Sequence, residues 1–216
     1  MKIKVCGMLE GRNIQSVDNL DVDLLGFIFY DKSPRHVIQF PSYMPAKRKR
    51  VGVFVNSSIE DVSSRVDEYS LSYVQLHGEE SVEYIASLRC HIPSTTQIIK
   101  SIAISSNSDI FLTENYSSCV DLFLFENRCV GYGGSGKKFD WSYLSSYRGP
   151  RPFLLSGGIG PEDISHLATI RHPYLYGIDL NSRFELSPGL KDIFLLQTFI
   201  NQLRNEQNKQ TLHVEA

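Results

Sequence analysis

The chain has 216 residues, a length that suits one large domain or two small ones. Its composition, 42% hydrophobic and 21% charged, is that of a folded globular protein and excludes wholesale disorder. The formal charge of −2 argues against nucleic-acid partners, which require a strongly basic face, and no window is apolar enough for a membrane span.

Eight short runs rich in Val, Ile, Leu and Phe follow one another along the chain, and we expect each to form a strand. Most are apolar on successive residues, which is typical of parallel strands that are covered on both faces. The runs span residues 2–6, 23–29, 50–55, 72–77, 95–104, 120–125, 152–156 and 175–180.

Segments with helical character separate most of these runs. Residues 59–69, 79–88 and 161–170 carry good helix formers, and 191–205 places apolar residues three and four positions apart. Strands that alternate with helices predict a parallel sheet, and eight such units close a single (β/α)8 barrel, the TIM barrel of the α/β class. The second unit is the exception, because its three prolines between 32 and 47 favour a loop with at most a short helix.

We find no linker rich in Pro, Gly or Ser, and we therefore expect one catalytic domain over residues 1–204. The last residues, 205–216, are polar and are expected to form a frayed tail. Four scattered cysteines (Cys6, Cys90, Cys119 and Cys129) fit neither a disulfide framework nor a paired metal motif. With no signal peptide at the start, reduced thiols, a cytoplasmic location and no bound metal are expected.

In a parallel barrel, the residues just after each strand face the active site. Cys6 and Glu126 end the first and sixth runs. The thiol is either a reactive group or a buried structural one, and the carboxyl group is either an acid whose pKa is raised by apolar surroundings or a solvated loop residue. His77 ends the fourth run and Arg35 lies in the loop after the second run, and each could contact a substrate or serve only the structure.

Two glycine or polar loops resemble phosphate cradles, because small residues let backbone N–H groups approach an anion. They are SGGIGPED (156–163) and NSRFE (181–185), which follow the seventh and eighth runs, where barrel enzymes commonly bind phosphate. A third cluster, GYGGSGKK (131–138), matches part of a nucleotide-binding loop. It lacks the Ser or Thr needed after Lys137 and is not followed by a helical pattern, which argues against an ATPase.

Several of these segments together resemble the phosphoribosylanthranilate isomerase family of tryptophan biosynthesis. They are KVCGM, GFIFYDKSPRHV, VGVFVN, VQLHGEE, GYGGSGKKFDW, LSGGI and GIDLNSRFE, in an order that covers about residues 2–204. The resemblance implies a (β/α)8 barrel without a cofactor. It also implies an Amadori rearrangement of N-(5-phosphoribosyl)anthranilate to 1-(2-carboxyphenylamino)-1-deoxyribulose 5-phosphate.

The resemblance also assigns roles to residues. Cys6 would be the general base and Glu126 the general acid, although the family has Asp at the second position. Arg35 would face the anthranilate carboxylate, and Arg183, where the family often has Gly, would either contact phosphate or point to solvent. The remaining substrate contacts implied are His77, Gly133, Ser135, Gly157, Gly158, Asp179, Asn181 and Ser182.

The departure at Glu126 keeps other interpretations open. The extra methylene moves the carboxyl group by up to about 1.5 Å, and shifts near 1 Å can cost about a hundredfold in rate. The chain could therefore be a weakly active or non-catalytic phosphosugar-binding barrel. A related aminoaldose isomerase is a second alternative, but such enzymes use two carboxylates rather than a Cys at the first strand. A phosphosugar is the expected small-molecule partner, and the chain is expected to be a monomer or a homodimer.

Overall fold

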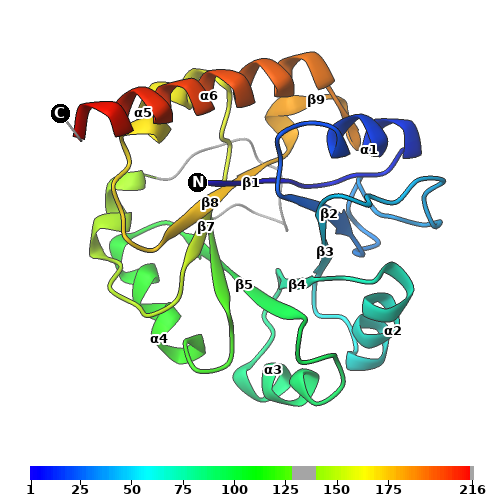
Figure 1. The fold of residues 1–216 in the computed structure, drawn as a ribbon. Helices are drawn as coiled ribbons and strands as arrows, with labels where there is room; N and C mark the ends of the chain where they lie inside the picture. Colours follow the sequence, from blue (N-terminus) through cyan, green and yellow to red (C-terminus); the bar gives the residue numbers. More distant parts are fainter. Residues whose placement is uncertain (128–139, 215–216) are drawn as a thin grey trace.

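The computed structural model describes residues 1–127 and 140–214. Within them, eight parallel strands close a barrel in sequence order, from β1 next to β2 round to β8 next to β1 (Figure 1). The single (β/α)8 barrel expected from the sequence is thus confirmed. The strands are β1 (Lys2–Val5), β2 (Leu24–Ile28), β3 (Lys49–Phe54), β4 (Tyr73–Leu76), β5 (Gln97–Ile104), β6 (Leu122–Asn127), β7 (Phe153–Leu155) and β8 (Leu175–Leu180).

Helices surround the barrel and cover the outer faces of its strands (Figure 1). Helix α2 begins after Ser58, whose side chain accepts a hydrogen bond from the Asp61 N–H, and α3 begins in the same way after Ser81. The α-helices are α1 (Gly11–Asp18), α2 (Ile59–Tyr69), α3 (Val82–Arg89), α4 (Thr113–Tyr116), α5 (Ile164–Thr169) and α6 (Ile193–Val214). Four 3₁₀ turns are η1 (Asn107–Leu112), η2 (Trp141–Ser146), η3 (Pro161–Asp163) and η4 (Ser182–Phe184).

The second unit has no helix, as its prolines predicted. All of residues 29–48 are described, and they form a loop in which His36 makes an isolated bridge to Ile28. Arg48 and Arg50 tie this loop down through hydrogen bonds to backbone carbonyls, including that of Pro45. The loop therefore takes the place of a helix in this unit, and the two arginines hold it in position.

The end of the chain differs from the expected frayed tail. Helix α6 continues past residue 204 and ends at Val214, and it lies against α5 and α1. The polar residues after 204 carry no apolar repeat, but Glu, Gln and Lys are good helix formers that extend a helix already anchored by packing. Neither α6, the longest helix, nor any other described helix has the apolar stretch of a membrane span.

Two apolar layers fill the fold. The larger layer lies between the barrel and its helices. The smaller layer lies inside the barrel, away from the carboxyl ends of the strands, and its residues come from β2 to β7. The smaller layer consists of Leu24, Val51, Tyr73, Ile99, Leu122, Leu124 and Leu154. Polar side chains replace it towards the carboxyl ends of the strands: Lys4, Gln75, Ser101 and Asp179 are all buried there. This change from apolar to polar positions the functional site.

Candidate active site

A cavity of about 330 Å³ opens at the carboxyl ends of the strands. The structure brings together at this cavity nine residues that the sequence singled out: Cys6, Arg35, His77, Glu126, Gly157, Gly158, Asp179, Asn181 and Ser182. The remaining two, Gly133 and Ser135, lie outside the described residues. The roles of all eleven stay predictions, but the nine share one site.

Cys6 directly follows β1 and is almost completely buried, at 4% exposure. Its backbone N–H donates to the Leu180 carbonyl, which extends the pairing of β1 with β8 by one residue. Space for the thiol depends on Gly26 of the neighbouring strand, because a Cβ there would lie 2.8 Å from the Cys6 sulfur. A residue without a side chain at position 26 of β2 therefore leaves the space that the Cys6 thiol occupies.

Buried charges surround this thiol. Lys4 is fully buried and its ammonium lies 2.9 Å from Asp179 Oδ1. Burial raises the pKa of Cys6 above its ordinary value, while the positive charges of Lys4 and Lys191 act in the opposite direction. Burial also opposes the charge on Lys4, but Asp179 and Cys6 outweigh it, and the pKa of Lys4 is raised. Lys4 is therefore a permanent cation beside the thiol.

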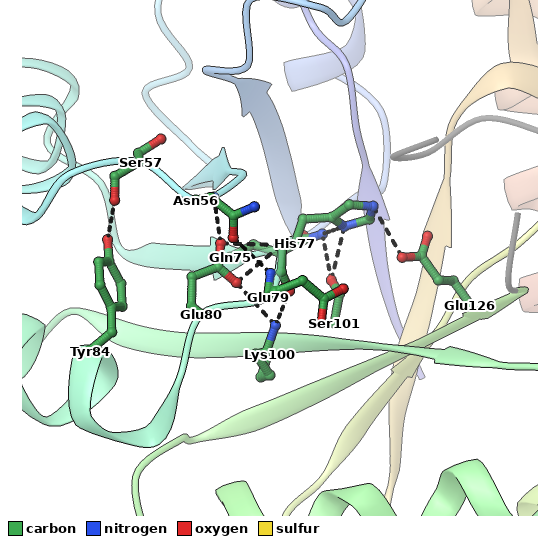
Figure 2. Close-up of polar contacts among 11 residues, drawn as sticks. Asn56, Ser57, Gln75, His77, Glu79, Glu80, Tyr84, Lys100, Ser101 and Glu126 are labelled. Carbon is green, nitrogen blue, oxygen red and sulfur yellow. Dashed lines mark hydrogen bonds and ion pairs between the residues drawn. The ribbon is translucent and has the colours of Figure 1, made fainter. Parts of the chain in front are cut away.

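Glu126 lies on β6, and its Oε1 is 3.0 Å from Nε2 of His77 (Figure 2). The two side chains are 16% and 12% exposed. Burial, with a further contribution from Asp179, raises the pKa of Glu126 to about 8, and burial lowers the pKa of His77 to about 4. At pH 7 the pair is thus a carboxylic acid and a neutral imidazole joined by a hydrogen bond, rather than an ion pair.

Two further side chains hold His77. Its Nδ1 lies 3.1 Å from Nε2 of Gln75 and 3.0 Å from Oγ of Ser101, on strands β4 and β5 (Figure 2). Lys100 of β5 holds the loop that follows β4, because its buried ammonium donates to the Gly78 carbonyl and to Glu80. The imidazole is therefore fixed from two neighbouring strands.

Arg35 is held by a residue that the sequence analysis did not single out. Its Nε and Nη2 donate to the carboxylate of Glu185 in β9 (Glu185–Ser187), which pairs with β10 (Leu190–Lys191). Lys191 donates to the same carboxylate at 2.7 Å. Burial opposes the charge of Glu185, but Arg35 and Lys191 together lower its pKa. The side chain of Arg35 also lines the cavity.

Residues of both expected phosphate loops line the same cavity. Gly157 and Gly158 have φ values of +91° and +69°, which favour glycine, and a Cβ at Gly157 would lie 2.8 Å from the Asn127 nitrogen. Arg183 also lines the cavity, and its Nη2 donates to Glu162 at 2.9 Å. The side chain of Arg183 is 46% exposed. It thus lies at the rim of the site.

The residues missed from the sequence share one property: they are polar side chains inside apolar strands or on the hairpin after η4. Lys4, Gln75 and Ser101 interrupt strands at positions that face the barrel interior. Glu185 and Lys191 belong to a hairpin too short to predict. Among the described residues, no three His, Cys, Asp or Glu side chains are grouped as metal ligands.

Comparisons with known proteins identify the family of the chain. A sequence model of the N-(5′-phosphoribosyl)anthranilate isomerase family matches residues 3–202. The chain is 48% identical over 209 residues to the N-(5′-phosphoribosyl)anthranilate isomerase of Parabacteroides distasonis, covering 94% of this chain and 93% of that protein. The isomerase of Phocaeicola vulgatus is 44% identical over 206 residues, covering 95% and 99%.

Solved structures show the same likeness. The phosphoribosylanthranilate isomerase of Thermotoga maritima has a TM-score of 0.79 at 29% identity, covering 95% of this chain and 99% of that one. A second isomerase structure, which contains reduced 1-(o-carboxyphenylamino)-1-deoxyribulose 5-phosphate, has a TM-score of 0.75 at 27% identity and the same coverage. By its sequence, its barrel and its relatives, the chain belongs to the N-(5′-phosphoribosyl)anthranilate isomerase family.

Proposed function

We propose that the chain converts N-(5-phosphoribosyl)anthranilate to 1-(2-carboxyphenylamino)-1-deoxyribulose 5-phosphate, the isomerase step of tryptophan biosynthesis, with Glu126 as general acid and Cys6 as general base. One observation carries the assignment of roles. The carboxyl group of Glu126 and the thiol of Cys6, which has the ammonium of Lys4 beside it, line the same cavity, and burial raises the pKa of Glu126 to about 8. This is the pairing of acid and base that the rearrangement requires.

The acid acts first. Glu126 gives its proton to the ring oxygen of the aminated ribose, the bond from that oxygen to C1 breaks, and the nitrogen lone pair forms a protonated imine. An acid with a pKa of about 8 is protonated at neutral pH and still acidic enough to transfer the proton. His77 Nε2, 3.0 Å from the carboxyl group, holds Glu126 in place.

The base acts second. The Cys6 thiolate removes the proton from C2, and the electrons of the C–H bond form a C1–C2 double bond as the imine nitrogen becomes neutral. The resulting enolamine then tautomerises to the ketone. Burial makes the thiolate a minority form at pH 7 but a stronger base when it is present, and Lys4 offsets part of the cost of its charge.

Binding groups around the cavity suit the two anionic groups of the substrate. We assign the Nη1 group of Arg35 to the anthranilate carboxylate, because Glu185 holds Nε and Nη2 of the guanidinium. We assign the phosphate to backbone N–H groups around Gly157, Gly158 and Ser182, which line the same cavity. We expect no resident cofactor or metal, because every step is a proton transfer.

We place the enzyme in the cytoplasm as a monomer or homodimer. A mechanism that uses a free thiol requires a reducing compartment, and Cys6, Cys90 and Cys119 are free. One similar structure, at 26% identity and a TM-score of 0.75, consists of monomers made from a dimeric isomerase of Thermotoga maritima.

A fluorescence assay tests the proposed reaction. Purified protein is mixed with freshly made phosphoribosylanthranilate, and the change in anthranilate fluorescence is followed against a Cys6→Ala control. Enzymatic conversion that depends on Cys6 supports the proposal. Intact binding of a reduced product analogue without turnover would instead favour a non-catalytic phosphosugar-binding barrel. Turnover of a histidine-pathway aminoaldose in preference to the anthranilate compound would favour the alternative isomerase.

A further inference from the structure

Four side chains form a continuous polar row across three neighbouring strands. Gln75 lies on β4 and His77 directly follows that strand, while Ser101 lies on β5 and Glu126 on β6 (Figure 2). Nε2 of Gln75 lies 3.3 Å from Oγ of Ser101, and both atoms lie within 3.1 Å of Nδ1 of His77. At the other end of the row, Nε2 of His77 is 3.0 Å from Oε1 of Glu126.

The direction of the hydrogen bonds follows from the donors present. A neutral imidazole has one N–H and one bare nitrogen. The amide nitrogen of Gln75 can only donate, and the Ser101 hydroxyl can donate as well, so both favour a bare Nδ1. The proton of the ring then lies on Nε2, from which it is donated to Oε1 of Glu126. The amide oxygen of Gln75 is buried and has no partner among the described residues.

This direction has a consequence for the acid. Oε1 of Glu126 accepts a hydrogen bond, so the proton of the neutral carboxyl group lies on Oε2, the oxygen that His77 does not hold. Once that proton is transferred, the same His77 N–H faces a carboxylate and becomes a charge-assisted hydrogen bond. The interaction is therefore stronger after proton transfer than before it, which is the property that accelerates a reaction.

We propose that Gln75 and Ser101 are positioning residues that hold His77 with its proton on Nε2, so that the acidic proton of Glu126 lies on Oε2 and points to the substrate. The inference rests on the proposed function of Glu126. Other charged groups act on Glu126 without setting this direction: Asp179 on β8 opposes its ionisation, and Lys4 on β1 and Lys100 on β5 favour it. The thiol of Cys6 lines the same cavity.

The position of the ring proton is measured directly by NMR on the resting enzyme. The protein is labelled with ¹⁵N-histidine, and the ring signals of His77 are identified by their loss in His77→Gln. We expect a protonated Nε2 and a bare Nδ1 at pH 7. A protonated Nδ1 would overturn the proposal, because it requires a rotated Gln75 amide and a Glu126 proton directed at His77. The measurement needs no substrate, so it tests the position of the His77 proton even if the protein does not catalyse the proposed reaction.

Kinetics of Ser101 variants provide the second test. Ser101→Ala should lower kcat by about tenfold with little change in KM, because the ring proton is no longer held on Nε2. Loss of that donor also makes Glu126 a weaker acid, so the pH at which Glu126 loses its proton should move upward. Ser101→Thr keeps the hydroxyl and should retain most of the activity.

Two further variants complete the kinetic test. Gln75→Met removes the amide at similar size and should act in the same direction as Ser101→Ala. Ser64→Ala, the same substitution on the exposed face of α2, should leave kcat and the pH profile unchanged. Parental kcat and an unmoved pH profile in both Ser101→Ala and Gln75→Met would overturn the proposal.

Discussion

The two sides of the cavity differ in the kind of group that surrounds each reactive side chain. Glu126 is held by a neutral imidazole, which is in turn held by an amide and a hydroxyl group. Cys6 is surrounded by charges, with Lys4, Asp179 and Lys191 all acting on its pKa. An acid must keep its proton until it is used. Burial beside the uncharged imidazole favours the protonated form of Glu126, with a further contribution from the negative charge of Asp179, while Lys4 and Lys100 act in the opposite direction. A base must lose its proton first, and nearby cations make that loss less costly.

Removing the base should have the largest effect. We expect Cys6→Ala to lower kcat by about 10²–10⁴-fold without disturbing the fold, because no other described side chain at the cavity is a thiol. Cys90→Ala, at an exposed position, is the matched control and should behave as the parent. The assay is turnover of phosphoribosylanthranilate, with circular dichroism to verify folding. Near-normal turnover by folded Cys6→Ala would refute its role as base.

Removing the acid proton comes next. Glu126→Gln keeps the size of the side chain but cannot donate an acidic proton, and its kcat should fall at least about a hundredfold. Glu126→Asp keeps the acid and should retain partial activity, although the shorter side chain withdraws from His77 Nε2. If the Gln variant turns over like the parent, Glu126 is not the acid.

The pH profile sharpens the comparison between the two sides. The active form needs a Cys6 thiolate and a protonated Glu126. The pKa of Cys6 is raised and that of Glu126 is about 8. Between pH 6 and pH 8, kcat/KM should therefore rise by about tenfold per pH unit as thiolate forms while Glu126 stays protonated. Above pH 8 the rise should stop, because Glu126 then loses its proton. A fall in kcat/KM from pH 6 to pH 8 would contradict these assignments.

The smallest effect is expected in the loop after β7, which we assign to phosphate binding and which carries neither the acid nor the base. Gly158 has a φ of +69°, so Gly158→Ala strains the loop and shifts its N–H groups. We expect KM to rise about fivefold with little change in kcat, since binding and not proton transfer is affected. Calorimetry with a phosphorylated product analogue measures the affinity, and unchanged affinity would show that the loop does not bind phosphate.

Much of the fold follows from the sequence because buried parallel strands are apolar along their whole length. Each of the eight predicted runs overlaps one strand, and Pro34, Pro41 and Pro45 mark the second unit, whose described residues form no helix between β2 and β3. The continuation of α6 to Val214 could not be predicted, because the polar residues after 204 show no apolar repeat.

The site was only partly predictable. Cys6, Arg35 and Glu126 were singled out by their places at or after the predicted strands, and the family resemblance gave them roles, whereas Ser101 lies inside a strand and in none of the motifs. A serine in an apolar strand has no sequence signal until the register of β4 and β5 places it beside His77. Glu185 was missed because its partner, Arg35, is 150 residues away in the chain.

The Arg35–Glu185 pair joins segments that lie 150 residues apart in the chain. Such a contact carries the entropic cost of closing the whole intervening loop. The guanidinium that we assign to carboxylate recognition is therefore held in place only when the first quarter of the chain meets the hairpin after β8. A half-barrel would contain Cys6 and Arg35 but could not orient the arginine. Affinity for an anthranilate-type carboxylate thus reports whether the eight-stranded barrel has closed, independently of whether the individual strands and helices have formed.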